Sequence, residues 1–129
     1  MNRRAWLAEV SWDMVVWQNE QLCLAKRAHH GPTSDGYEVC RLFWESSMTT
    51  IMTLDEMVDI CRKCHRMAPF TNYNGNTFSA IARAMIEMLG VSNQSKTLAR
   101  SLAGHIVAGV ASDEEILAFR KFCAGLGES

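Results

Sequence analysis

Apolar residues recur along most of this chain at intervals of three and four, which is the period of an amphipathic helix. The clearest example is the segment 78–89, where Phe78, Ile81, Met85 and Leu89 would share one side of a helix. No segment shows the alternation of apolar and polar residues, enriched in β-branched side chains, that indicates a strand. The pattern therefore predicts an all-α fold.

Caps and helix-breaking residues divide the chain into about five to six helices, which we expect to form a single domain over residues 1–129. Two pairs of residues have the spacing of capping boxes, which begin helices: Thr53 with Glu56, and Ser112 with Glu115. The predicted helices cover about 3–29, 35–47, 54–68, 77–90, 95–110 and 113–125. A long N-terminal helix would thus precede a helical bundle over about 35–125.

The long N-terminal helix, ended by Gly31 and Pro32, carries two apolar stripes rather than one. One stripe contains Trp6, Val10, Met14, Trp17 and Leu24, and the other contains Ala5, Trp12, Val16 and Cys23. At 100° per residue the stripes lie roughly 140° apart. A helix on the surface of a monomer has one apolar stripe, so this helix either runs through the centre of its own domain or docks its second stripe onto another chain.

We predict the second of these arrangements, with Trp12 and Val16 in a contact between chains, because tryptophan is enriched where binding energy concentrates in interfaces. The C-terminal helix offers another candidate surface, since Ile116, Phe119 and Phe122 form a broad apolar face near the chain end. We expect these five residues to bind another protein or a second copy of the chain in a homodimer.

Composition narrows the function classes. A net charge of -1 gives no general attraction to nucleic acid or to an anionic membrane. No apolar run approaches the roughly 18 residues of a membrane span, and Glu9 and Asp13 interrupt any signal-peptide core. The five scattered cysteines suit reduced thiols better than a disulfide framework. These features predict a cytoplasmic protein with no membrane partner.

The stretch Cys61-Arg62-Lys63-Cys64-His65 overlaps the spacing used for c-type haem, for zinc and for dithiol chemistry. Both thiols, however, continue the apolar stripe of Leu54 and Met57, and free cysteine packs as a small hydrophobe. No second short-spaced cysteine pair completes a zinc site. We predict buried thiols, no metal and no cofactor. A thiolate metal or redox protein using Cys61, Cys64 and His65 is an alternative.

Residues 80–102 resemble a helix-turn-helix motif, with an alanine-rich segment followed by Leu-Gly-Val-Ser at the turn. The resemblance implies a DNA-binding transcriptional regulator. Leu98 nevertheless comes two residues after the position that the motif buries, and the basic residues Arg83, Lys96 and Arg100 are few for a phosphate-binding surface. DNA is therefore an alternative partner rather than the predicted one.

Catalytic motifs are missing from the sequence: it has no glycine-rich phosphate loop, no G-x-S-x-G and no H-E-x-x-H. We predict that the chain is not an enzyme. The pattern as a whole favours a small regulatory protein that acts by protein-protein binding. An antiactivator that sequesters a transcription factor or an enzyme, an immunity protein and an adaptor all fit this description.

Overall fold

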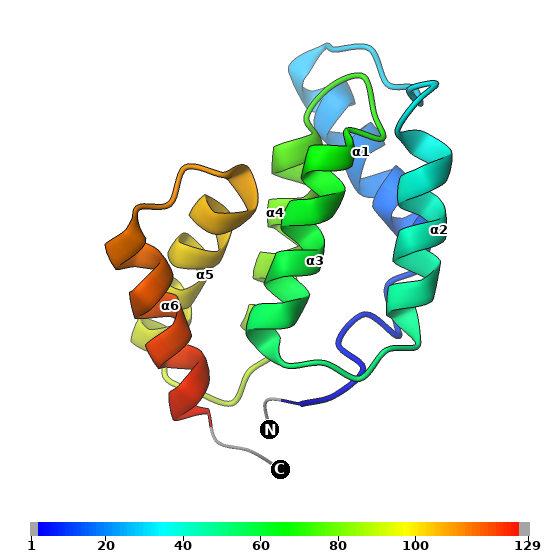
Figure 1. The fold of residues 1–129 in the computed structure, drawn as a ribbon. Helices are drawn as coiled ribbons and strands as arrows, with labels where there is room; N and C mark the ends of the chain where they lie inside the picture. The colour runs from blue at the N-terminus through cyan, green and yellow to red at the C-terminus, as the bar shows by residue number, and fades with distance from the viewer. Residues whose placement is uncertain (1–2, 127–129) are drawn as a thin grey trace.

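The computed structural model describes residues 3–126 and confirms the all-α fold (Figure 1). Its helices are α1 (Trp12–Lys26), α2 (Tyr37–Met48), α3 (Leu54–Met67), α4 (Asn74–Glu87), α5 (Asn93–Ala108) and α6 (Asp113–Gly125). None of these helices combines the length and the apolar character needed to cross a bilayer.

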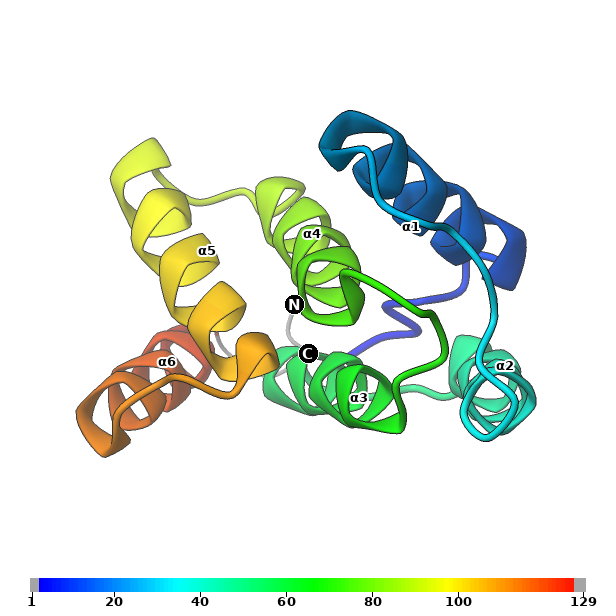
Figure 2. The same ribbon diagram turned by 90° about the horizontal axis from the view of Figure 1, so that it is seen from above.

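The helices pack in two layers, which are seen from above in Figure 2. One layer contains α1, α4 and α5, and the other contains α2, α3 and α6. The central helices α3 and α4 contact each other across the two layers. Within its own layer α4 contacts α1 and α5, and α3 contacts α2 and α6. The largest buried side chains between the layers include Trp44, Phe78 and Phe119, so one continuous core holds both layers together.

The prediction of a helix from residue 3 is wrong, because α1 begins at Trp12. The side chain of Ser11 caps this helix by accepting a hydrogen bond from the Met14 backbone N–H at 3.2 Å. The chain before Ser11 turns back on itself instead. Arg4 exchanges two backbone hydrogen bonds with Met52, both of 2.9 Å, and so ties the N-terminal segment to the connection between α2 and α3.

Burial of three apolar side chains explains why the first residues leave the helix. In a continuous helix Trp6, Leu7 and Val10 would lie on the side of α1 that faces away from the core. Folded back, all three are buried, and the Val10 carbonyl accepts a hydrogen bond from Trp44 Nε1 at 2.8 Å. The gain from burying these side chains outweighs the helical hydrogen bonds that the segment forgoes.

The later helix starts follow the local sequence more closely. Both predicted capping boxes are present, Thr53 with Glu56 at the start of α3 and Ser112 with Glu115 at the start of α6. Helix α4 begins three residues before the predicted Thr77, since the Asn74 side chain bonds both the N–H and the carbonyl of Phe70. This side chain fixes the turn ahead of α4 without a conventional N-cap.

Candidate functional site

Trp12 lies in the core, not on a surface that a partner could reach. Its side chain is 5% exposed, and its ring stacks on Phe70 with the centroids 5.8 Å apart and also meets the edge of Tyr37. Val16, on the same stripe, is partly buried against the core. The prediction that this stripe contacts another chain is corrected by this packing: the chain's own α2 and the loop before α4 cover it.

The opposite stripe of α1 is the exposed one. Met14, Trp17 and Leu24 lie about 120–160° from Trp12 around the helix axis, and Trp17 is 58% exposed. Together with the exposed Gln21, these residues form what we call the outer face of α1. The helix therefore does carry two apolar sides, but Met14, Trp17 and Leu24, which sequence periodicity assigned to the core, face outward. Trp6 and Val10 of the same predicted stripe lie before the helix and are buried.

A groove adjoins the outer face of α1 where α1 packs against α4. It has a volume of about 310 Å³. Its lining is mostly apolar and comprises Val10, Asp13, Met14, Trp17, Gln18, Ala80, Ile81, Ala84 and Met85. Ala80 and Ala84 lie one turn apart on α4, and their small side chains leave the space that forms the groove. Sequence reasoning missed this site because it assigned Met14 and Trp17 to the core stripe.

The candidate residues of α6 divide between core and surface. Phe119 is 1% exposed and is therefore not available to a partner, which corrects its predicted role. Phe122 is partly buried and stacks on Phe119 with the ring centroids 6.3 Å apart. Ile116 is half-buried and lines a hollow that also contains Asp55 and Arg120. Only Leu117 presents a large apolar side chain outward on this helix.

The thiols of Cys61 and Cys64 are fully buried, as predicted from their phase on α3. Burial raises the pKa of the Cys61 thiol, while a hydrogen bond with Cys40 and then burial raise the pKa of Cys64. Within residues 3–126 no group of three or more His, Cys, Asp or Glu side chains is arranged to hold a metal ion. Because the thiolate is the reactive form, these environments do not favour redox or nucleophilic chemistry.

His65 and Arg62 point away from the two thiols, toward the C-terminal end of α5. His65 Nδ1 donates to the Val107 carbonyl at 2.7 Å, and Arg62 Nη1 donates to the Ile106 carbonyl at 3.0 Å. Carbonyls in the last turn of a helix have no partner within the helix, so these side chains satisfy them, and the charge of Arg62 complements the helix dipole. The stretch Cys61–His65 thus packs its two thiols into the core and connects α3 to α5 through Arg62 and His65.

We expect the cysteines to be protected in the native protein. At pH 8 a thiol reagent such as dithionitrobenzoate should label all five at least ~100-fold more slowly than in 8 M urea, because reaction requires opening of the core. Burial also raises the pKa of Cys123 to about 12, which adds to its protection. Rapid labelling of Cys61 and Cys64 in the folded protein would contradict the packing described here.

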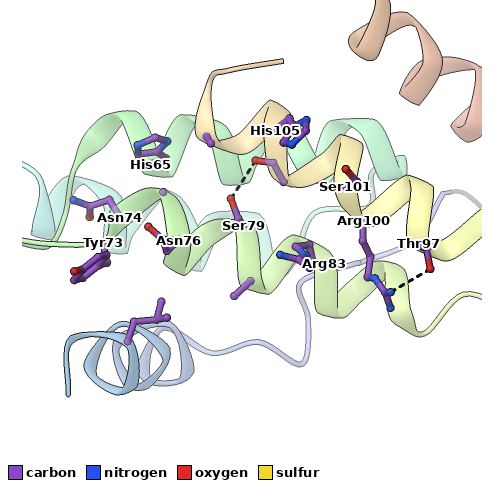
Figure 3. A pocket seen from close by; sticks show the side chains of 15 residues that line it. His65, Tyr73, Asn74, Asn76, Ser79, Arg83, Thr97, Arg100, Ser101 and His105 are labelled. Carbon is purple, nitrogen blue, oxygen red and sulfur yellow. Dashed lines mark hydrogen bonds between the residues drawn. The ribbon is translucent and has the colours of Figure 1, made fainter. Parts of the chain in front are cut away.

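A second, larger hollow runs along the antiparallel pair α4 and α5, and most of the side chains that line it are polar (Figure 3). We call it the polar cleft; its volume is about 910 Å³. Its lining comprises Leu22, His65, Tyr73, Asn74, Gly75, Asn76, Ser79, Ala80, Arg83, Thr97, Arg100, Ser101, Gly104, His105 and Ala108. At its edge, His105 Nδ1 bonds Glu115 at 2.6 Å, and this contact is the main reason that the pKa of Glu115 is lowered.

The helix-turn-helix interpretation does not match the packing of α5. Leu98 is 57% exposed and does not anchor α5 in the core; Ala99, Leu102 and Ala103 do so instead. Arg83 and Arg100, which that interpretation assigned to DNA phosphates, both line the polar cleft, whereas Lys96 does not. That two different helices bring these arginines to one cleft is the feature of this region that sequence spacing did not reveal.

Comparison of the chain with known protein families, with curated proteins and with solved structures gives no match. The two candidate sites are therefore the outer face of α1 with its groove, and the polar cleft, each argued from its own residues.

Proposed function

We propose that this protein is a small non-enzymatic regulator that acts in the cytoplasm by binding another protein. The observation that carries the proposal is the outward-facing Trp17, 58% exposed beside an apolar groove. A large apolar side chain exposed next to an apolar hollow is typical of a protein-protein contact, where tryptophan often provides much of the binding energy. An antiactivator, an immunity protein and an adaptor are the regulator types that fit.

The expected occupant of this face is an amphipathic helix of the partner. Met14, Trp17, Gln21 and Leu24 follow one another at spacings of three, four and three residues. That spacing forms the straight seam along which two helices pack side by side. The groove beside the seam would receive a side chain of the partner helix, because its small residues Ala80 and Ala84 leave room for one.

The proposal is tested by removing the two apolar side chains at the groove. The double substitution of Met14→Ser and Trp17→Ser should leave the melting temperature nearly unchanged but weaken partner binding by at least ~100-fold, because both side chains are exposed before binding. Affinity capture from the native lysate with a cross-linker identifies the partner, and titration with that purified partner measures the change. Sedimentation equilibrium of the wild type shows whether the partner is a second copy.

A matched control lies on α2, where Val39 and Leu42 are also exposed and apolar. This helix belongs to the other layer and contributes no residue to the groove. Changing both to serine should leave binding within about twofold, as expected for surface changes outside an interface. Equal loss of binding in the two double variants would contradict the proposed surface, and so would a partner that binds the Met14 and Trp17 variant as tightly as the wild type.

A further inference from the structure

The polar cleft brings together two arginines from different helices in a chain whose net charge is -1. Arg83 and Arg100 line it, and its lining residues include no Asp or Glu, while Glu87 pairs with Arg100 and Glu115 with His105 at the edge of the cleft. Hydroxyl and amide groups make up most of the remaining polar lining, as Figure 3 shows for Ser79, Ser101, Thr97 and Asn76. Arg83, unpaired among the described residues, and the neutral donors around it make this concave surface complementary to an anion.

Arg83 is the group in this cleft whose charge is available to a ligand. It is exposed on α4, and within residues 3–126 no carboxylate forms an ion pair with it. Its side chain lies across α5 at Gly104: a Cβ added there would be 3.6 Å from Arg83 Cδ. The aliphatic part of Arg83 therefore lies close to the α5 backbone at Gly104, at a distance that would be ordinary van der Waals contact even if a methyl group stood there.

Arg100 reaches the same stretch of the cleft from α5 and is held in place by its neighbours (Figure 3). One guanidinium nitrogen pairs with Glu87, and another lies 3.4 Å from Thr97 Oγ1. Because these contacts restrain Arg100, a ligand would lose less conformational entropy by ordering it than by ordering a free side chain. The two arginines therefore present donors from both walls of the cleft, one restrained and one free to adapt.

The cleft extends well beyond the arginines. Tyr73 lies at its other end, ten residues before Arg83, which at 1.5 Å per residue corresponds to about 15 Å along α4. Between these ends, Ser79 donates to the Gly104 carbonyl at 3.3 Å, and the wall also includes small residues such as Gly75 and Ala80. This length and width suit a molecule larger than a bare inorganic anion.

We propose that the polar cleft binds a small organic phosphate, with Arg83 and Arg100 contacting the phosphate and the rest of the molecule lying toward Tyr73. Guanidinium groups match the geometry and the charge of phosphate oxygens, and they bind phosphate more strongly than a neutral donor does. The site is concave and has few cations, whereas a nucleic-acid duplex requires many phosphate contacts over an extended surface. A small molecule therefore fits it better than DNA. This inference is independent of the protein-binding face on α1.

Isothermal titration calorimetry at low salt tests the proposal with ADP, pyrophosphate and adenosine as probes. The wild type should bind ADP and pyrophosphate, and adenosine should bind at least ~10-fold more weakly than ADP because it lacks the phosphates. Arg83→Gln should weaken ADP binding about 10-fold or more, while its thermal melt stays unchanged because Arg83 is exposed.

Arg66→Gln is the matched control, since Arg66 is exposed on α3, lies outside the cleft and changes the net charge by the same amount. It should bind ADP within about twofold of the wild type. The proposal is overturned if the wild type binds neither ADP nor pyrophosphate at millimolar concentrations, or if the Arg83 and Arg66 variants lose affinity equally. Retention of a DNA duplex through Arg83, without binding of either phosphate probe, would also overturn it and assign the cleft to nucleic acid.

Discussion

Replacing Trp12 with alanine should lower the free energy of unfolding by about 3–5 kcal/mol, the range for removing a large aromatic side chain from a core. Trp12 packs against Phe70 and Tyr37, and in doing so joins α1 to α2 and to the turn before α4. Loss of the indole would leave a cavity that these neighbours cannot fill without moving. Urea denaturation followed by circular dichroism measures the change without relying on tryptophan fluorescence.

Trp17 provides the control on the same helix. Trp17→Ala removes the same side chain from an exposed position and should change the free energy of unfolding by less than about 1 kcal/mol. A third variant separates packing from hydrogen bonding, because the buried Trp12 Nε1 has no acceptor among the described residues. Trp12→Phe removes this unsatisfied donor and should therefore be much less destabilising than Trp12→Ala. Equal effects of Trp12→Ala and Trp17→Ala would show that Trp12 is not in the core.

Replacing Asn19 with alanine should destabilise the fold by about 2–4 kcal/mol, because it leaves several buried polar groups without partners. Asn19 is fully buried on α1. Its Nδ2 donates to the Asn72 carbonyl at 2.8 Å and to Thr77 Oγ1 at 2.9 Å. Its Oδ1 accepts from His30 Nδ1 at 2.8 Å. One side chain thus holds together α1, α4 and the two loops beside them.

Gln21→Ala serves as the comparison for Asn19, since Gln21 is an exposed amide on the same helix. Its effect on urea denaturation should stay within about 0.5 kcal/mol. Hydrogen exchange provides a second readout: in the Asn19 variant the amides around residues 28–33 and 70–73 should lose protection, because these segments pair with each other next to Asn19. Unchanged protection there would argue that Asn19 does not organise the loops.

Several features followed from the sequence alone, because each depends on neighbours within one helical turn. The capping boxes at Thr53 and Ser112 placed the starts of α3 and α6, since a cap is completed by a residue three positions later. The phase of Cys61 and Cys64 with Leu54 predicted their burial for the same reason. Helical periodicity also revealed that the N-terminal helix has two apolar sides.

Periodicity indicates which residues share a side of a helix. It does not indicate which side packs against the rest of the protein, and only the tertiary structure decided that. Trp12 faces the core of the folded chain and Trp17 faces out, although both are tryptophans on the same helix. The early residues left the helix because folding back buries Trp6, Leu7 and Val10. Met52, far along the chain, then provides backbone partners for Arg4. Arg83 and Arg100 meet in one cleft only because α4 and α5 pack as an antiparallel pair. Such contacts depend on the relative placement of whole helices, which no local spacing encodes.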